Sequence, residues 1–106
     1  GRLIGDCAIK LDETDTRLAE FGITIAPQEQ RNGFATESVH GLLTFLFEQA
    51  GLHRVSTLVD QNNVASVNLM KRVGFRQEGL FIEHAFLKGN WVSEYLFAML
   101  RREWIL

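Results

Sequence analysis

The sequence predicts one α/β domain on a mixed β-sheet, in the order strand, strand, helix, strand, helix, strand, strand. The first two segments carry apolar residues at every second position, two inner segments repeat them every three or four residues, and the last two segments are aromatic and β-prone. A β-branched segment lies between the two inner ones. The length of 106 residues suits a single domain spanning 1–106. Hydrophobic residues at 46% and charged residues at 23% exclude a disordered chain.

The first two strands are predicted over 3–11 and 20–25. Apolar and polar residues alternate in both segments, as in a strand with one buried face. The polar residues 12–15 form the turn between them. Pro27, the only proline, has a fixed φ and no N–H, which suits the end of the second strand.

The middle of the chain predicts a parallel unit. Apolar residues at helical spacing run from 35 to 50 and stop at Gly51, a typical helix end. The segment 55–59 suits an interior strand, and the helix before it allows parallel pairing with the previous strand. A second helix over 64–73 follows, with Asn63 as its N-cap and Gly74 at its end.

The last two strands are predicted as a hairpin. Residues 75–87 and 91–100 are aromatic and β-prone, and they flank Lys88-Gly89-Asn90, a short connection that contains glycine. This completes the mixed α/β sheet, with one parallel step at its centre.

Composition favours a small partner. The net charge is −2 and no basic run exceeds Arg101-Arg102, so neither nucleic acid nor an anionic membrane surface is expected. No apolar stretch reaches the ~20 residues that span a bilayer. Cys7 is the only cysteine and the three histidines lack ligand spacing, so we expect no metal, no internal disulfide and a cytoplasmic location.

Residues 30–36 are a candidate anion site. They lie between a predicted strand and the first turn of a helix, where N–H groups lack intrahelical acceptors and the helix dipole is positive. Gly33 and Ala35 leave room for an anion at the backbone. The alternative is an ordinary strand-to-helix turn. The glycine patterns of P-loop and dinucleotide proteins are absent from the sequence.

The start of the second helix is a further candidate. Parallel strands that diverge would let one ligand meet both helix starts, at 30–36 and at Asn63 and Ser66. The alternatives are that Asn63 only caps the helix and that Ser66 bonds its own backbone.

Several motifs in order resemble the GNAT superfamily of acetyl-CoA-dependent N-acetyltransferases, in particular the branch of ribosomal-protein amino-terminal and spermidine acetyltransferases. The motifs are Gln30-x-x-Gly33-x-Ala35, Gly51-Leu52-His53-Arg54-Val55, Asn63-x-x-Ser66, Gly74-Phe75, Glu78-Gly79 and Leu100-Arg101-Arg102-Glu103-Trp104. The resemblance implies transfer of acetyl from acetyl-CoA to a primary amine: a protein amino terminus, a polyamine or a small amine.

The resemblance also implies a coenzyme A site between the second and third strands. Backbone amides of 31–36 would bind the pyrophosphate, the strand through Ile23 and Ile25 would pair with the pantetheine arm, and Asn63 would bond the arm from the other side. The residues implied at the coenzyme are Ile23, Ile25, Gln30, Arg31, Asn32, Gly33, Phe34, Ala35, Thr36, Asn63, Ser66 and Met70.

Catalysis needs a base, because an alkyl amine with a pKa near ~10.4 is protonated at neutral pH. Relatives place a tyrosine at Met70 to protonate the thiolate, and Ser66 is its expected substitute here. The position of the family's glutamate base falls on Ala85, so Glu83 or a water is the expected base; the alternative is that Glu83 is a solvated strand residue. Whether Glu94 compensates stays open.

Compared with the family, the chain lacks the first two strands and the two helices that usually cover the acceptor. The strand 3–11 would then have an unpaired edge, so we expect a homodimer or higher homo-oligomer through that edge or the final hairpin. The alternative function is a non-catalytic acyl-CoA-binding or oligomerisation module.

Overall fold

The computed structural model describes the backbone of residues 5–25 and 34–104, and the side chains of 8–22 and 35–104. Its elements follow the predicted order, with a π-helical turn and a short last helix added. They are β1 (Gly5–Leu11), β2 (Leu18–Ile25), α2 (Phe34–Thr44), the π-helix η1 (Phe45–Gln49), β3 (Arg54–Asp60), α3 (Val64–Val73), β4 (Arg76–Leu87), β5 (Asn90–Leu100) and α4 (Arg101–Trp104).

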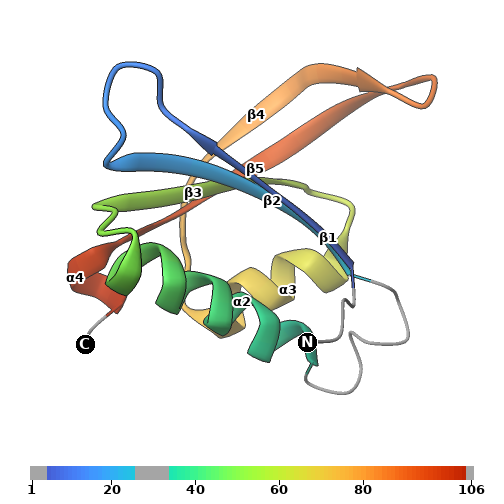
Figure 1. Ribbon diagram of the computed structural model, residues 1–106. Helices are drawn as coiled ribbons and strands as arrows, with labels where there is room; N and C mark the ends of the chain where they lie inside the picture. The colour runs from blue at the N-terminus through green and yellow to red at the C-terminus, as the bar shows by residue number, and fades with distance from the viewer. Residues whose placement is uncertain (1–4, 26–33, 105–106) are drawn as a thin grey trace.

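The five strands form one mixed sheet in the order β1-β2-β3-β5-β4. Among the strands that the structure describes, β2 and β3 pair in parallel and the other three pairings are antiparallel. Helices α2 and α3 lie side by side under one face of the sheet (Figure 1). Within the described residues no helix lies on the opposite face, which we call the open face. The predicted mixed α/β fold with a central parallel step is confirmed.

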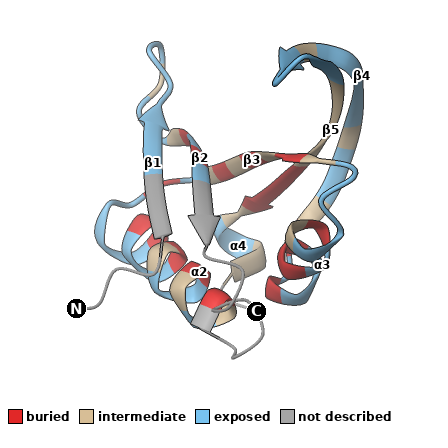
Figure 2. Cartoon of the chain, turned by 90° about the vertical axis from the view of Figure 1, so that its right-hand side faces the viewer, coloured by how far each residue is buried: buried red, intermediate tan, exposed pale blue. Residues whose placement is uncertain are grey.

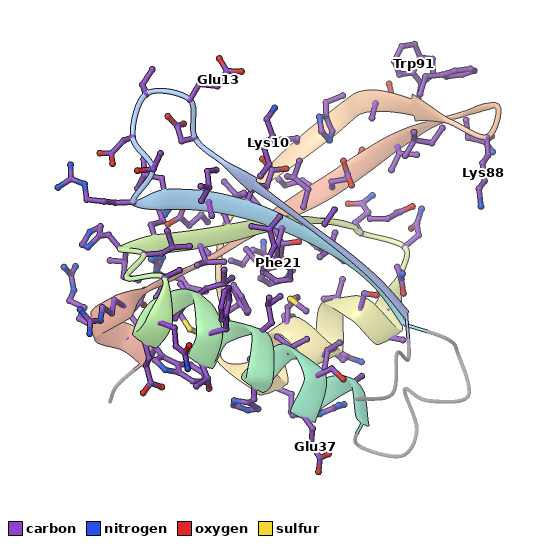
Figure 3. The ribbon with its side chains drawn as sticks, in the orientation of Figure 1. Lys10, Glu13, Phe21, Glu37, Lys88 and Trp91 are labelled. Carbon is purple, nitrogen blue, oxygen red and sulfur yellow. The ribbon has the colours of Figure 1, made fainter. Side chains whose placement is uncertain are left out.

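The core lies between the sheet and these two helices. Alternate residues of β3 are buried, so Val55, Thr57 and Val59 face the helices and the residues between them face the open side. Phe21 of β2 points toward the same helices (Figure 3). Phe47 and Phe97 are fully buried in this layer. Most side chains of β4, which forms a hairpin with β5, are exposed to solvent (Figure 2).

Two boundaries differ from the prediction for local reasons. The loop before β2 is shorter than expected, because the Asp12 carboxylate accepts the N–H groups of Thr14 and Asp15 and the ladder restarts at Leu18. The long first helix changes to η1 at Phe45, and the N–H of Ala50 donates to the Phe45 carbonyl at 2.9 Å. A π-helical turn does not produce a regular spacing of apolar residues, so the sequence does not predict it.

An ion-pair network joins β3, β4 and α4. The Arg54 guanidinium donates to both oxygens of Glu78, at 2.8 and 2.7 Å. Arg76 bridges Glu78 at 2.9 Å and Glu103 at 3.1 Å, and Glu103 also accepts the Leu100 N–H. Bidentate, partly buried pairs of this kind are the strong ones on a protein surface.

Substitution of Glu78 should destabilise the fold in a pH-dependent way. The Arg54 guanidinium lowers the pKa of the Glu78 carboxyl below its usual value of 4.5. The stabilisation is therefore present above that value and is lost as the pH falls through the lowered pKa. We expect Glu78→Gln to cost about 1 kcal/mol at pH 7 and almost nothing near pH 2. Urea unfolding at both pH values measures this, with the exposed Glu13→Gln as control. An equal loss at both pH values would contradict it.

Candidate active site

The two parallel strands separate after a short ladder. Leu18, Ala19 and Glu20 of β2 lie opposite residues 54–56 of β3. Beyond Glu20, β2 runs on to Ile25 and β3 to Asp60 with no further pairing between them in the described register. Figure 2 shows β3 crossing toward α3. The expected divergence is present, and it leaves backbone N–H and C=O groups of β2 facing a gap.

A pocket of about 350 Å³ lies on the open face at this gap. We call it the gap pocket. Among the described residues, the ionisable side chains that line it are Lys10, Glu20 and Glu94, and Leu58 adds an apolar wall. Gly22 also lines it, and a Cβ built on that glycine would meet nothing within 4 Å. The pocket therefore combines an unobstructed stretch of β2 with two carboxylates.

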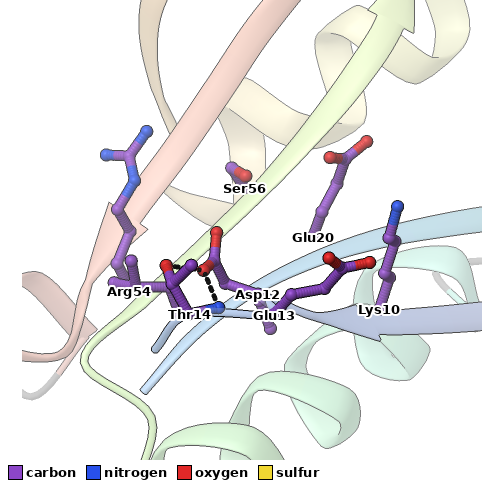
Figure 4. Close-up of a pocket in the computed structure, with 9 residues that line it drawn as sticks. Lys10, Asp12, Glu13, Thr14, Glu20, Arg54 and Ser56 are labelled. Carbon is purple, nitrogen blue, oxygen red and sulfur yellow. Dashed lines mark hydrogen bonds between the residues drawn. The ribbon is translucent and has the colours of Figure 1, made fainter. Parts of the chain in front are cut away.

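A larger hollow of about 540 Å³ adjoins the gap pocket and shares Lys10 and Glu20 with it. It lies over the paired residues of β2 and β3, beside the loop that carries Asp12 and Glu13 (Figure 4). Hydrogen bonds from Thr14 and Asp15 lower the pKa of the Asp12 carboxyl, so Asp12 keeps its negative charge. The hollow extends the gap pocket along the open face, and its lining carries the carboxylates of Asp12, Glu13 and Glu20 beside the cations Lys10 and Arg54.

The start of α2 is only partly described. Gln30, Arg31, Asn32 and Gly33, predicted at the coenzyme, lie outside the described residues. Phe34 begins the helix, as expected for an anion site at its first turn. The predicted coenzyme residues Ala35 and Thr36 follow: Ala35 is buried in the core, and Thr36 is half-buried.

The start of α3 matches the predicted cap. Asn63 Oδ1 accepts the N–H of Ser66 at 3.2 Å, so the cap assigned from sequence is confirmed. Because β2 and β3 run parallel, their C-terminal ends open to the same side, and α3 begins shortly after β3 ends. Asn63 and Ser66 therefore stand at the same edge of the sheet as the ends of β2 and β3. Met70, one turn further along, is 1% exposed and packs in the core.

Arg72 of α3 reaches across to the first turn of α2. Its Nη1 donates to Thr36 Oγ1 at 3.4 Å, which joins the two helices near the predicted anion site. No sequence pattern singles out Arg72, because the link depends on how α2 and α3 pack. A guanidinium here would favour a nearby anion.

Residues 1–76 match the family described as an acetyltransferase (GNAT) domain. The chain belongs to the GNAT family of acetyltransferases. Proteins of this family use acetyl-CoA.

Among curated relatives, the uncharacterized N-acetyltransferase p20 of Bacillus licheniformis is 29% identical over 96% of the chain and 57% of its own length. The spermidine N(1)-acetyltransferase of Vibrio cholerae is 36% identical over 71% of the chain and 43% of its own length. The chain spans about half the length of the curated relatives it matches.

Solved structures agree with the fold. A chimera of the Vibrio cholerae spermidine N-acetyltransferase and hSSAT superposes with a TM-score of 0.88 at 29% identity, over 99% of this chain and 64% of that one. The Vibrio cholerae enzyme in complex with CoA and spermine gives a TM-score of 0.78 at 31% identity, over 85% and 53% of the two chains.

In this GNAT domain the predicted base Glu83 lies in an irregular part of β4. Its backbone has a φ of 46°, its side chain is exposed, and its N–H donates to Ser93 Oγ at 2.8 Å. Glu94, whose role the sequence analysis left open, lies in the wall of the gap pocket. Its place on the open face could have been inferred from alternation along the last strand, but its distance from β2 could not.

Two further findings concern the described residues only. Their His, Cys, Asp and Glu side chains form no group of three or more that could hold a metal ion. None of their helices is long and apolar enough to cross a membrane.

Proposed function

We propose that this GNAT domain transfers acetyl from acetyl-CoA to a primary amine by direct attack in a ternary complex. The observation that carries the proposal is the early end of the β2–β3 ladder, which opens a gap onto a pocket with two carboxylates. The N-acetyltransferases among its relatives support the reaction class.

The helix side of the gap suits coenzyme A. Residues 21–25 of β2 offer backbone groups at the gap, which a pantetheine arm could pair with as a strand would. Amides of 31–36 would hold the pyrophosphate, with Asn63 and Ser66 flanking the arm. Since Met70 is buried, it would support the arm's surroundings by packing alone. When bound, the coenzyme supplies the activated acetyl group.

The open face suits the acceptor amine. Glu20 and Glu94 line the gap pocket, and Asp12 and Glu13 extend the negative charge beside it. A cationic amine would be drawn to this face, whereas the coenzyme would occupy the other. A protein amino terminus, a polyamine or a small amine all meet this requirement.

We propose the following roles around the reacting atoms. Backbone N–H groups of β2 near Ile23 and Ile25 would stabilise the oxyanion. Ser66 would protonate the leaving thiolate. Glu83 or a water molecule remains the base expected from sequence. The single cysteine suits a cytoplasmic enzyme.

Release of free thiol from acetyl-CoA tests the function. The chain is incubated with acetyl-CoA and a panel of amines: spermidine, a peptide with a free amino terminus and a simple alkyl amine. We expect thiol release with at least one of them. If no amine causes thiol release although coenzyme A binds tightly, the result would favour the alternative of a non-catalytic acyl-CoA-binding or oligomerisation module. That alternative predicts coenzyme binding without acetyl transfer.

We also propose that the chain forms a homodimer or higher homo-oligomer. β1 and β4 are the outermost of the described strands, and the hairpin of β4 and β5 exposes Phe81, Ile82, Phe86, Leu87 and Trp91. Trp91 points away from the sheet near the hairpin tip (Figure 3). Long exposed apolar edges tend to pair with another chain. Light scattering at micromolar concentration should give at least twice the mass of one chain, and a stable monomer would contradict this.

A further inference from the structure

We propose that this chain acetylates the side-chain amine of its own Lys10. The inference rests on the proposed acetyl transfer and adds a modification site to it. Three observations carry it: Lys10 lines the gap pocket, its side chain has an unobstructed path along β2 to the gap, and the other two lysines of the chain lie elsewhere.

The sheet register places Lys10 on the open face. Lys10 of β1 stands directly opposite Glu20 of β2, and Glu20 stands opposite Ser56 of β3. Ala19 and Phe21, on either side of Glu20, are buried in the core, so the row through Glu20 points the other way. Figure 3 shows Lys10 above the sheet, away from α2 and α3, and Figure 4 shows it pointing the same way as Glu20. The Lys10 amine is therefore on the face where we place the acceptor.

Lys10 stands level with the end of the β2–β3 ladder. Glu20 and Ser56 are the last paired residues, so the gap opens one step beyond Lys10. Gly22 is the diagonal neighbour of Lys10 across β1 and β2, at a spacing of ~7–8 Å that long side chains bridge. A Cβ built on Gly22 would meet nothing within 4 Å, and its partner Ala8 carries only a methyl group. The flexible lysine stem can therefore lie along Gly22 and bring its amine to the gap.

The amine is not held in place by a partner. Lys10 is exposed, and within the described residues no carboxylate forms an ion pair with it. Glu20 and Glu94 line the same pocket, so their charges attract the lysine without fixing its nitrogen. The pocket therefore attracts the Lys10 amine in the same way as it would attract an added amine.

The other two lysines have no such position. Lys71 lies on α3 and Lys88 at the far end of the β4–β5 hairpin (Figure 3), and neither lines the gap pocket or the hollow beside it. Both are exposed, as Lys10 is. Spontaneous reaction with a thioester should therefore mark all three lysines alike. Transfer from a bound thioester should mark Lys10, because proximity raises the effective concentration of its amine.

The transfer balances with acetyl-CoA as the donor. The Lys10 ammonium gives one proton to water, and the neutral nitrogen attacks the carbonyl carbon of the thioester. The carbon–nitrogen bond forms as the carbon–sulfur bond breaks, and the second proton passes to the thiolate. The products are acetylated Lys10, free thiol and one H⁺. Acetylation removes the positive charge of Lys10, which leaves Glu20 and Glu94 as the ionisable side chains among the described residues of the gap pocket.

The test follows acetyl groups on the chain itself. The purified chain is incubated with acetyl-CoA that carries a deuterated acetyl group, without any added amine, and peptide mass spectrometry measures the label on each lysine. We expect Lys10 to gain label about tenfold faster than Lys71 or Lys88. Acetic anhydride, which needs no binding site, should label the three lysines at similar rates. The rate for each chain should not depend on chain concentration, because donor site and acceptor belong to one chain.

Matched variants check the assignment. Lys10→Arg keeps the positive charge but should lose the fast labelling, whereas Lys71→Arg and Lys88→Arg should keep it. If acetic anhydride also labels Lys10 faster, the inference is overturned, because the preference then belongs to the lysine and not to the bound donor. A rate for each chain that rises in proportion to concentration would also overturn it, since one chain would then acetylate another.

Thiol release with the amine panel, measured in parallel, separates this inference from the proposed function. Thiol release with an amine, together with equal labelling of the three lysines, would overturn self-acetylation and leave acetyl transfer to amines intact. Fast labelling of Lys10 without transfer to any added amine would support the inference and limit the acceptor to the chain itself. If neither an amine nor Lys10 receives acetyl although coenzyme A binds, both proposals fail.

Discussion

Phe97→Ala should lower the free energy of unfolding by about 3–5 kcal/mol. Phe97 is 0% exposed and lies in the middle of β5, paired with Thr57 of β3 on one side and Gln77 of β4 on the other. Its ring also packs against Tyr95 at 6.0 Å between centroids. Truncation leaves a cavity where the sheet meets both helices. Since the free energy of unfolding of a domain of this size is only about 5–15 kcal/mol, this substitution removes a large part of it. Urea unfolding followed by circular dichroism measures the loss.

Phe45→Ala is the matched control for that substitution. Phe45 is 52% exposed at the start of η1, so the same truncation should cost less than about 1 kcal/mol. Equal losses in the two variants would mean that the buried layer between sheet and helices does not dominate stability.

Gly33→Asp should reduce the affinity for coenzyme A at least ~100-fold. The expectation follows from sequence position, since Gly33 immediately precedes the start of α2 at Phe34. An aspartate there would place a side chain and a negative charge where the pyrophosphate is proposed to meet free N–H groups. Isothermal titration calorimetry with coenzyme A measures the change.

The control for this experiment is Gly41→Asp, the same change further along α2. A Cβ at Gly41 meets nothing within 4 Å, so the fold should tolerate it and coenzyme affinity should be unchanged. Should Gly33→Asp bind as tightly as Gly41→Asp, the anion site would have to lie elsewhere.

The elements were predictable because local signals and tertiary structure agree. Alternation located β1 and β2, and the sequence from Asn63 to Gly74 marked both ends of α3. The connection around Gly89, which has a φ of 80°, identified the hairpin of β4 and β5. In each case a short segment carries the whole signal, so one sequence is enough.

The candidate site was less predictable, because it depends on geometry between distant segments. The contact of His84 with Glu94 needs a bulge of residues 82–84, and the ungapped count along β4 that suggested Glu83 assumes regular alternation. The packing of Arg72 on Thr36 likewise depends on the helix pair. The gap itself was expected through the resemblance to GNAT proteins, since no residue pattern states where a parallel ladder stops.

The short ladder between β2 and β3 also has a dynamic consequence. The hairpin of β1 and β2 joins the rest of the sheet through three paired positions at one end. Amide protons near that junction should be protected from exchange as strongly as those of the core. Amide protons toward Ile25 should exchange whenever the hairpin opens locally. Solvent isotope exchange should therefore rise along β2 from Leu18 to Ile25. A bound molecule that supplied the missing strand partner would flatten this gradient, so exchange along a single strand would report occupancy before any reaction is observed.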